Sequence, residues 1–103
     1  MTELTNDNLN ELIKENEKVL VQYGAAWCGS CRMVKPKFKS LADKTDGVAF
    51  YYVDAEKYPE SRKLAEVNNL PTFAYFEGGQ LKSQVMGTKF EKVEALLDAS
   101  SSD

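Results

Sequence analysis

Residues 27–36 read WCGSCRMVKP, and this stretch joins a short apolar run at 19–21 to a segment in which apolar residues recur at helical spacing. Two cysteines three positions apart at such a strand-to-helix junction are typical of a redox-active pair. Cys28 is predicted to lie at the helix N-terminus, where unpaired backbone N–H groups and the positive end of the helix dipole favour the thiolate. Because the thiolate is the nucleophile, Cys28 is expected to react first. Cys31 follows one turn later, on the same side, and is expected to be the more buried partner in a disulfide ring.

The neighbours of the two cysteines suit the same chemistry. Gly29 keeps the loop tight and permits close approach by a substrate, and Trp27 is expected to shield the site and to offer a flat apolar surface to a docking chain. The alternative interpretation is a pair of reduced core cysteines, because free cysteine is often buried in proteins.

Apolar periodicity on both sides of this stretch predicts a single domain, residues 1–103, with an α/β fold. Thr5 is predicted to cap a first helix, and Pro36 and Pro59 are placed early in the second and third helices. The predicted order is helix, strand, helix, strand, helix, hairpin, helix, which indicates a central mixed β-sheet flanked by helices on both faces. The ranges are a short edge strand at 2–4, helices near 9–13, 32–42, 59–67 and 90–97, strands at 19–21, 48–53, 72–76 and 81–86, and an irregular tail at 100–103.

Composition excludes several function classes. The chain has 13 basic and 16 acidic residues, a formal net charge of -3, 2 cysteines and no histidine. An acidic balance argues against nucleic acid and against anionic membrane surfaces as partners. Two cysteines cannot supply the four ligands of a structural zinc site, so no metal is expected. No signal-like segment or membrane-length apolar run is present, which predicts a cytoplasmic protein.

The block at 27–36, followed by Leu70-Pro71-Thr72 and then by Gly87, resembles the thioredoxin family over nearly the whole chain. The resemblance implies a thioredoxin fold in which Pro71 is cis and faces the two sulfurs. It also implies that the backbone of Leu70 pairs with a substrate segment as an added strand, and that Gly87 lets the substrate approach. The plainer alternatives are a strand-start proline at 71 and a helix-entry turn at 87.

The chain departs from the family pattern at four positions. Ser30 replaces the usual proline between the cysteines, and its hydroxyl is expected to stabilise the thiolate and to make the protein a weaker reductant. Gln22 stands where thioredoxins usually carry a buried Asp, and Phe50 where they often carry a Lys, so carboxylate-assisted deprotonation of Cys31 is in doubt. The other interpretation of Gln22 is a hydrogen-bonded buried polar group. Gly24 replaces a frequent tryptophan, which reduces one wall of the site.

The resemblance implies protein disulfide reduction, with Cys28 as nucleophile and Cys31 as resolving cysteine. No cofactor is expected to bind, and electrons are expected to come indirectly from NADPH through a thioredoxin reductase. The expected partners are that reductase and disulfide-containing proteins, and the chain is expected to be a monomer. Three alternatives stay open: the same chemistry run toward oxidation or isomerisation, a non-catalytic binding module of the same fold, and an iron–sulfur or zinc site shared between two chains.

Overall fold

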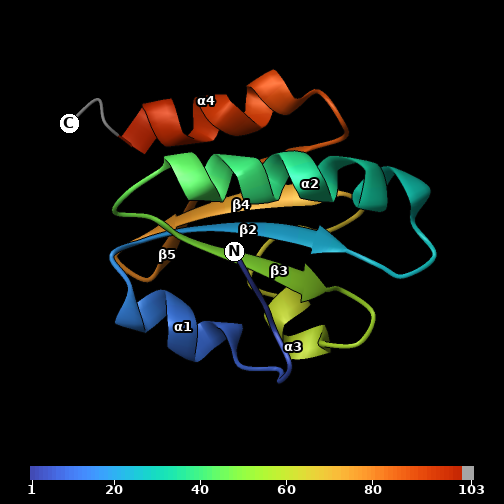
Figure 1. Ribbon diagram of the computed structural model, residues 1–103. Coiled ribbons are helices and arrows are strands. Elements are labelled where there is room, and N and C mark those ends of the chain that lie inside the picture. Colours follow the sequence, from blue (N-terminus) through green and yellow to red (C-terminus); the bar gives the residue numbers. More distant parts are fainter. Residues whose placement is uncertain (101–103) are drawn as a thin grey trace.

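A five-stranded sheet with helices on both faces forms the protein, as described for residues 1–100 by a computed structural model (Figure 1). The strand order is β1-β3-β2-β4-β5, so the sheet is mixed: β1, β3 and β2 run parallel, while β4 and β5 are antiparallel to their neighbours. The elements are β1 (Thr2–Glu3), α1 (Leu9–Glu15), β2 (Lys18–Gly24), α2 (Gly29–Lys44), β3 (Ala49–Asp54), α3 (Pro59–Arg62), β4 (Thr72–Glu77), β5 (Gln80–Met86) and α4 (Phe90–Ser100). The predicted fold class is confirmed.

Two clusters of buried apolar side chains fill the two layers. Helices α2 and α4 cover one face of the sheet and α1 and α3 the other (Figure 1). Phe38 of α2 anchors the first cluster, with its ring centroid 5.2 Å from that of Phe50 and 5.7 Å from that of Phe73. Leu9 and Ile13 of α1 belong to the second cluster, below the sheet. The strand β2 is buried along nearly all of its length because it contributes to both clusters, which explains its continuous apolar run.

The predicted hairpin is confirmed in detail. Gly78 and Gly79 connect β4 to β5 with φ of 61° and 80°, a left-handed conformation at both central residues that favours glycine. The predicted edge strand is also confirmed, since β1 pairs in parallel with β3.

Three local predictions differ from the structure. The first helix begins at Leu9, after Asn8, and Thr5 does not cap it, because the Leu4 N–H still pairs with the Tyr52 carbonyl and the chain must turn before a helix can start. The third helix ends at Arg62, where the backbone tightens into three-residue turns, although the apolar residues at 64–67 still pack on the lower cluster. The fourth helix extends to Ser100, and the rest of the predicted irregular tail lies outside the described residues.

Candidate active site

The two cysteines lie at the junction between the buried strand β2 and the N-terminus of helix α2. Strand β2 ends at Gly24, and a turn closed by a 3.1 Å hydrogen bond from the Cys28 N–H to the Ala25 carbonyl leads into the helix. Cys28 is the N-cap residue of α2, with φ −84° and ψ 104°. The sulfur therefore lies at the helix end whose free N–H groups stabilise negative charge, as predicted.

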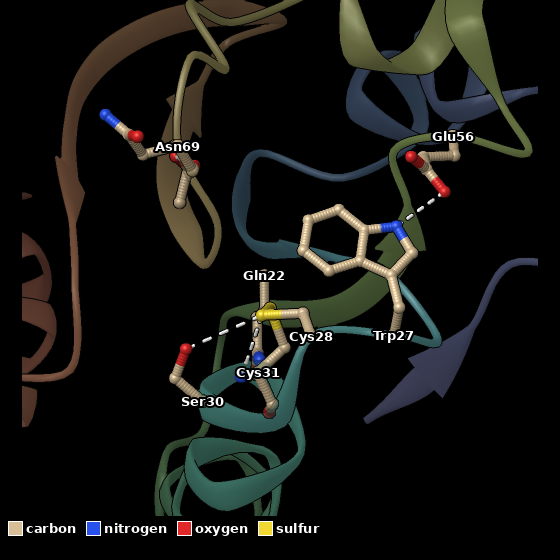
Figure 2. Close-up of a disulfide and its surroundings, with 8 residues drawn as sticks. Gln22, Trp27, Cys28, Ser30, Cys31, Glu56 and Asn69 are labelled. Carbon is tan, nitrogen blue, oxygen red and sulfur yellow. Dashed lines mark hydrogen bonds between the residues drawn. A yellow bond between two sulfur atoms is a disulfide. The ribbon is translucent and has the colours of Figure 1, made fainter.

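Cys28 and Cys31 form a disulfide, with their Cα atoms 5.3 Å apart (Figure 2). The Cys31 N–H donates to the Cys28 sulfur at 3.2 Å, so the first turn of the helix supplies a donor to that sulfur directly. Cys28 is 4% exposed and Cys31 is fully buried, which confirms the predicted difference in burial. A partner can reach the pair only from the Cys28 side.

Ser30 and Gly29 form the outer edge of the ring. The Ser30 hydroxyl lies 3.6 Å from the Cys28 sulfur, within the range of a hydrogen bond to sulfur, so the predicted contact is present. Gly29 is exposed, and a β-carbon at that position would meet no atom within 4 Å. The space above residue 29 is therefore open to an approaching chain.

Trp27 is held beside the disulfide by an acidic residue that the sequence did not single out. The indole Nε1 donates to the Glu56 carboxylate at 2.7 Å (Figure 2), while 66% of the side chain stays exposed. Glu56 itself is positioned by Asp54, whose Oδ1 accepts the backbone N–H groups of Glu56 and Lys57 at 3.0 Å each. An Asp that ends a strand commonly makes such a turn, so the turn itself could have been predicted from the sequence, whereas the contact with Trp27 could not.

The loop before β4 carries Leu70 and Pro71, and a backbone hydrogen bond joins it to Gly87, which follows β5. The Leu70–Pro71 peptide bond is cis, as the family resemblance implied. Leu70 packs against the small cluster formed by Ala25 and the two cysteines, and the Pro71 carbonyl accepts the Gly87 N–H at 2.9 Å. Gly87 has φ of 98°, and a β-carbon there would meet no atom within 4 Å. Glycine is thus favoured at residue 87 by its backbone conformation.

Two residues beside this loop, the polar Asn69 and the apolar Met86, were not predicted as part of the site. Asn69 donates from Nδ2 to the Met86 sulfur at 3.4 Å, and Met86 is 49% exposed. Met86 pairs with Thr72 across the β4–β5 ladder, so it stands next to the cis-proline segment. An exposed methionine beside Gly87 adds adaptable apolar surface to this edge of the site.

Gln22 lies behind Cys31, as the resemblance implied. The side chain is fully buried, and its Nε2 donates to the Cys31 carbonyl at 3.1 Å. Its Oε1 is buried and has no hydrogen-bond partner in the part of the chain that the structure describes. The amide is therefore only half satisfied, and it cannot titrate.

The residue beside Gln22 on β3 is Tyr52, so the placement of Phe50 behind the cysteines is wrong. The parallel register pairs Gln22 with Tyr52, whereas Phe50 pairs with Leu20 and packs in the upper core against Phe38. Both aromatic residues face α2 because side chains alternate along a strand, so the same sequence pattern fits either position. The aligned strand pairs decide between them.

Within residues 1–100, no group of three or more His, Cys, Asp or Glu side chains is arranged to hold a metal ion. The same residues include no helix whose length and apolar content match a bilayer span.

Comparisons with known proteins agree with this geometry. The family model described as Thioredoxin matches residues 1–99. Thioredoxin from Ovis aries is 40% identical over 80 residues, which cover 78% of this chain and 76% of that protein. Oxidised mitochondrial thioredoxin 3 from Saccharomyces cerevisiae superposes with a TM-score of 0.87 at 32% identity, covering 96% of this chain and 94% of that one. A further match, at 26% identity and a TM-score of 0.88 over 98% of this chain and 94% of the other, is thioredoxin f2 in complex with ferredoxin:thioredoxin reductase.

Proposed function

The chain belongs to the thioredoxin family and is a disulfide reductase, and we propose that its electrons come from NADPH through a thioredoxin reductase. The reductase and disulfide-containing proteins are then its two classes of partner. The complex of thioredoxin f2 with a reductase supports a partner of that kind. One observation carries the disulfide-exchange function itself: the disulfide lies at a helix N-terminus with only the Cys28 side within reach of a partner.

In this proposal the two sulfurs take different steps, and their positions support the assignment. Cys28, at the helix end and next to the Ser30 hydroxyl, is the thiolate that attacks a substrate disulfide and forms a mixed disulfide. Cys31 then attacks the Cys28 sulfur, releases the reduced substrate as a thiolate and restores the internal disulfide. The reductase returns two electrons and regenerates the dithiol.

Substrate docking uses the loop that faces this ring. A substrate segment pairs with the backbone at Leu70, passes beside Pro71 and crosses the open space at Gly87. Leu70 packs on the cysteine cluster, and the hydrogen bond from Gly87 to the Pro71 carbonyl holds the two segments together, which supports this path. Trp27 contributes exposed apolar surface on the other side.

The test is coupled turnover. Insulin reduction is measured with NADPH and a thioredoxin reductase, and separately with a ferredoxin-dependent reductase. NADPH oxidation that depends on this chain supports the proposed route, and turnover only with the ferredoxin-dependent enzyme contradicts it. A reduction potential near about −270 mV fits a reductase, whereas one near about −180 mV would place the chain with isomerases.

We also propose that the chain acts as a monomer in the cytoplasm. Its only cysteines form one reactive pair, which fits a reducing compartment where disulfides are transient and catalytic. Sedimentation of the purified protein and cell fractionation against compartment markers test the two parts, and a dimer or a non-cytoplasmic fraction would contradict them.

A further inference from the structure

Tyr52 occupies the space left by a missing side chain at the end of β2. A β-carbon placed on Gly24 would overlap the Tyr52 hydroxyl oxygen and would lie 3.2 Å from the β-carbon of Cys31. The phenol of Tyr52 and the buried resolving cysteine therefore border the same small volume. The sequence predicted that Gly24, in place of a tryptophan, leaves one wall of the site incomplete. The Tyr52 side chain, from β3, fills that space.

The same tyrosine lines a way out to solvent. A surface pocket of about 410 Å³ is lined by Tyr52 together with Ala25 and Arg32, which flank the cysteine loop. Cys31 is fully buried and does not line this pocket. The Tyr52 side chain thus lies between the buried sulfur region and water. In this disulfide form the Tyr52 hydroxyl makes no hydrogen bond to any residue among the first 100, so it is available to a thiol or to water.

Charged side chains from β1, from α2 and from the end of β3 lie around Tyr52. Lys35 lies over the ring, 4.3 Å from its centroid, and is paired with Glu3. Burial raises the pKa of the Tyr52 hydroxyl, and the negative charges of Asp54 and Glu3 raise it further, so the phenol keeps its proton at neutral pH. The charged residues that line the pocket with it are Glu3, Arg32, Lys35, Asp54 and Lys57.

Other groups near Cys31 are poorly suited to move a proton. The Gln22 amide lies behind the cysteine but cannot titrate, and the chain has no histidine. The Asp54 Oδ1 accepts two backbone N–H groups of the following turn, which directs that carboxylate toward Glu56 and Lys57. A hydroxyl can accept a proton on its oxygen while it gives up its own, and it ends the exchange unchanged.

We propose that the Tyr52 hydroxyl relays the proton of the Cys31 thiol to water in the adjoining pocket during the resolving step. Once Cys31 is freed from the disulfide, its S–H donates to the phenol oxygen across the volume that both groups border, and the phenol O–H proton passes to water as the thiol proton arrives. The Cys31 thiolate then attacks the Cys28 sulfur, the bond between Cys28 and the substrate breaks, and the substrate leaves as a thiolate. The substrate is reduced and the cysteine pair is oxidised. The inference rests on the disulfide-reductase function and adds a residue to its second half.

Ellman's reagent separates the two halves of the reaction. In stopped flow, the reduced protein releases one thionitrobenzoate when Cys28 attacks and a second when Cys31 resolves the mixed disulfide. Tyr52→Phe keeps the ring and removes the hydroxyl. We expect the second phase to slow about tenfold and its pH profile and solvent isotope effect to change, with the first phase unaltered.

Two further variants make the test specific. Tyr51→Phe is the matched control, because Tyr51 faces the other side of the sheet, where its hydroxyl accepts a hydrogen bond from Asn16. Gly24→Ala retains the hydroxyl but displaces it with a methyl group, and it is expected to slow the same phase.

The outcomes are separable. If Tyr52→Phe resolves with the wild-type rate, pH profile and isotope effect, the relay is wrong and the reductase function stands. If the wild-type protein shows no first phase, the reductase function itself has failed.

Discussion

Replacing Gln22 with Glu exchanges a buried amide for an acid of nearly the same size, directly behind Cys31. The amide donates to the Cys31 carbonyl at 3.1 Å, and the side chain is fully buried. A protonated acid can still donate to that carbonyl oxygen. An ionised one loses its hydration, faces an acceptor rather than a donor, and is strongly disfavoured.

The expected magnitude follows from this burial. The folded pKa of the new carboxyl is raised above the unfolded value of about 4.3. A raised folded pKa leaves the stability of the variant intact below about pH 4.3 and removes it as the pH climbs, until the carboxyl ionises in the folded protein as well. The loss is about 1.4 kcal/mol per pH unit, so two units above that value cost about 2.7 kcal/mol.

The assay is a series of urea midpoints between pH 4 and pH 8 on the oxidised protein, in which the cysteines do not titrate. The wild type serves as reference, and Gln80→Glu is the matched control because it makes the same chemical change at an exposed position at the start of β5. We expect the Gln22→Glu curve to fall away from the other two as pH rises. Three parallel curves would refute the reasoning, because they would show that position 22 is solvated.

Two further predictions concern single contacts. Ser30→Ala removes the hydroxyl 3.6 Å from the Cys28 sulfur. The Cys28–Cys31 couple should then become about 30 mV more reducing at pH 8, the equivalent of about 1.4 kcal/mol, in a titration against glutathione. Ser40→Ala, elsewhere on α2, should leave the reduction potential unchanged. Desolvation works to raise the pKa of Asp7, but hydrogen bonds from the Ser61 hydroxyl and from backbone N–H groups lower it overall. The stability that Asp7 contributes should therefore be present above its unfolded pKa and be lost as pH falls through the lower folded value. Asp7→Asn should weaken this acid dependence in urea melts between pH 2 and pH 5.

The main course of the fold could be predicted because each element has a local cause. The apolar run in β2 reflects burial on both faces, and the Gly78-Gly79 turn requires a backbone that glycine adopts readily. The cysteine pair and the residue types around it were also predictable, since a helix N-terminus explains both their spacing and their reactivity.

Features that depend on how distant segments align could not be predicted. Phe50 and Tyr52 face the same layer, so only the register of β3 against β2 shows that Tyr52 lies beside Gln22. The contact between Trp27 and Glu56 joins two loops whose distance in space the sequence does not contain. Thr5 does not cap the first helix because a tertiary backbone pair at Leu4 holds the chain extended.

Trapping of the mixed disulfide tests the roles of the two cysteines most directly. Cys31→Ser and Cys28→Ser variants are reduced, mixed with a disulfide-containing protein such as insulin, and examined by mass spectrometry. Because the sulfur of Cys28 is the one at the helix end and within reach of a partner, the Cys31→Ser variant should accumulate a covalent adduct on Cys28, and the Cys28→Ser variant should form none. An adduct on Cys31 in the Cys28→Ser variant, formed as fast as the adduct on Cys28, would contradict the assignment.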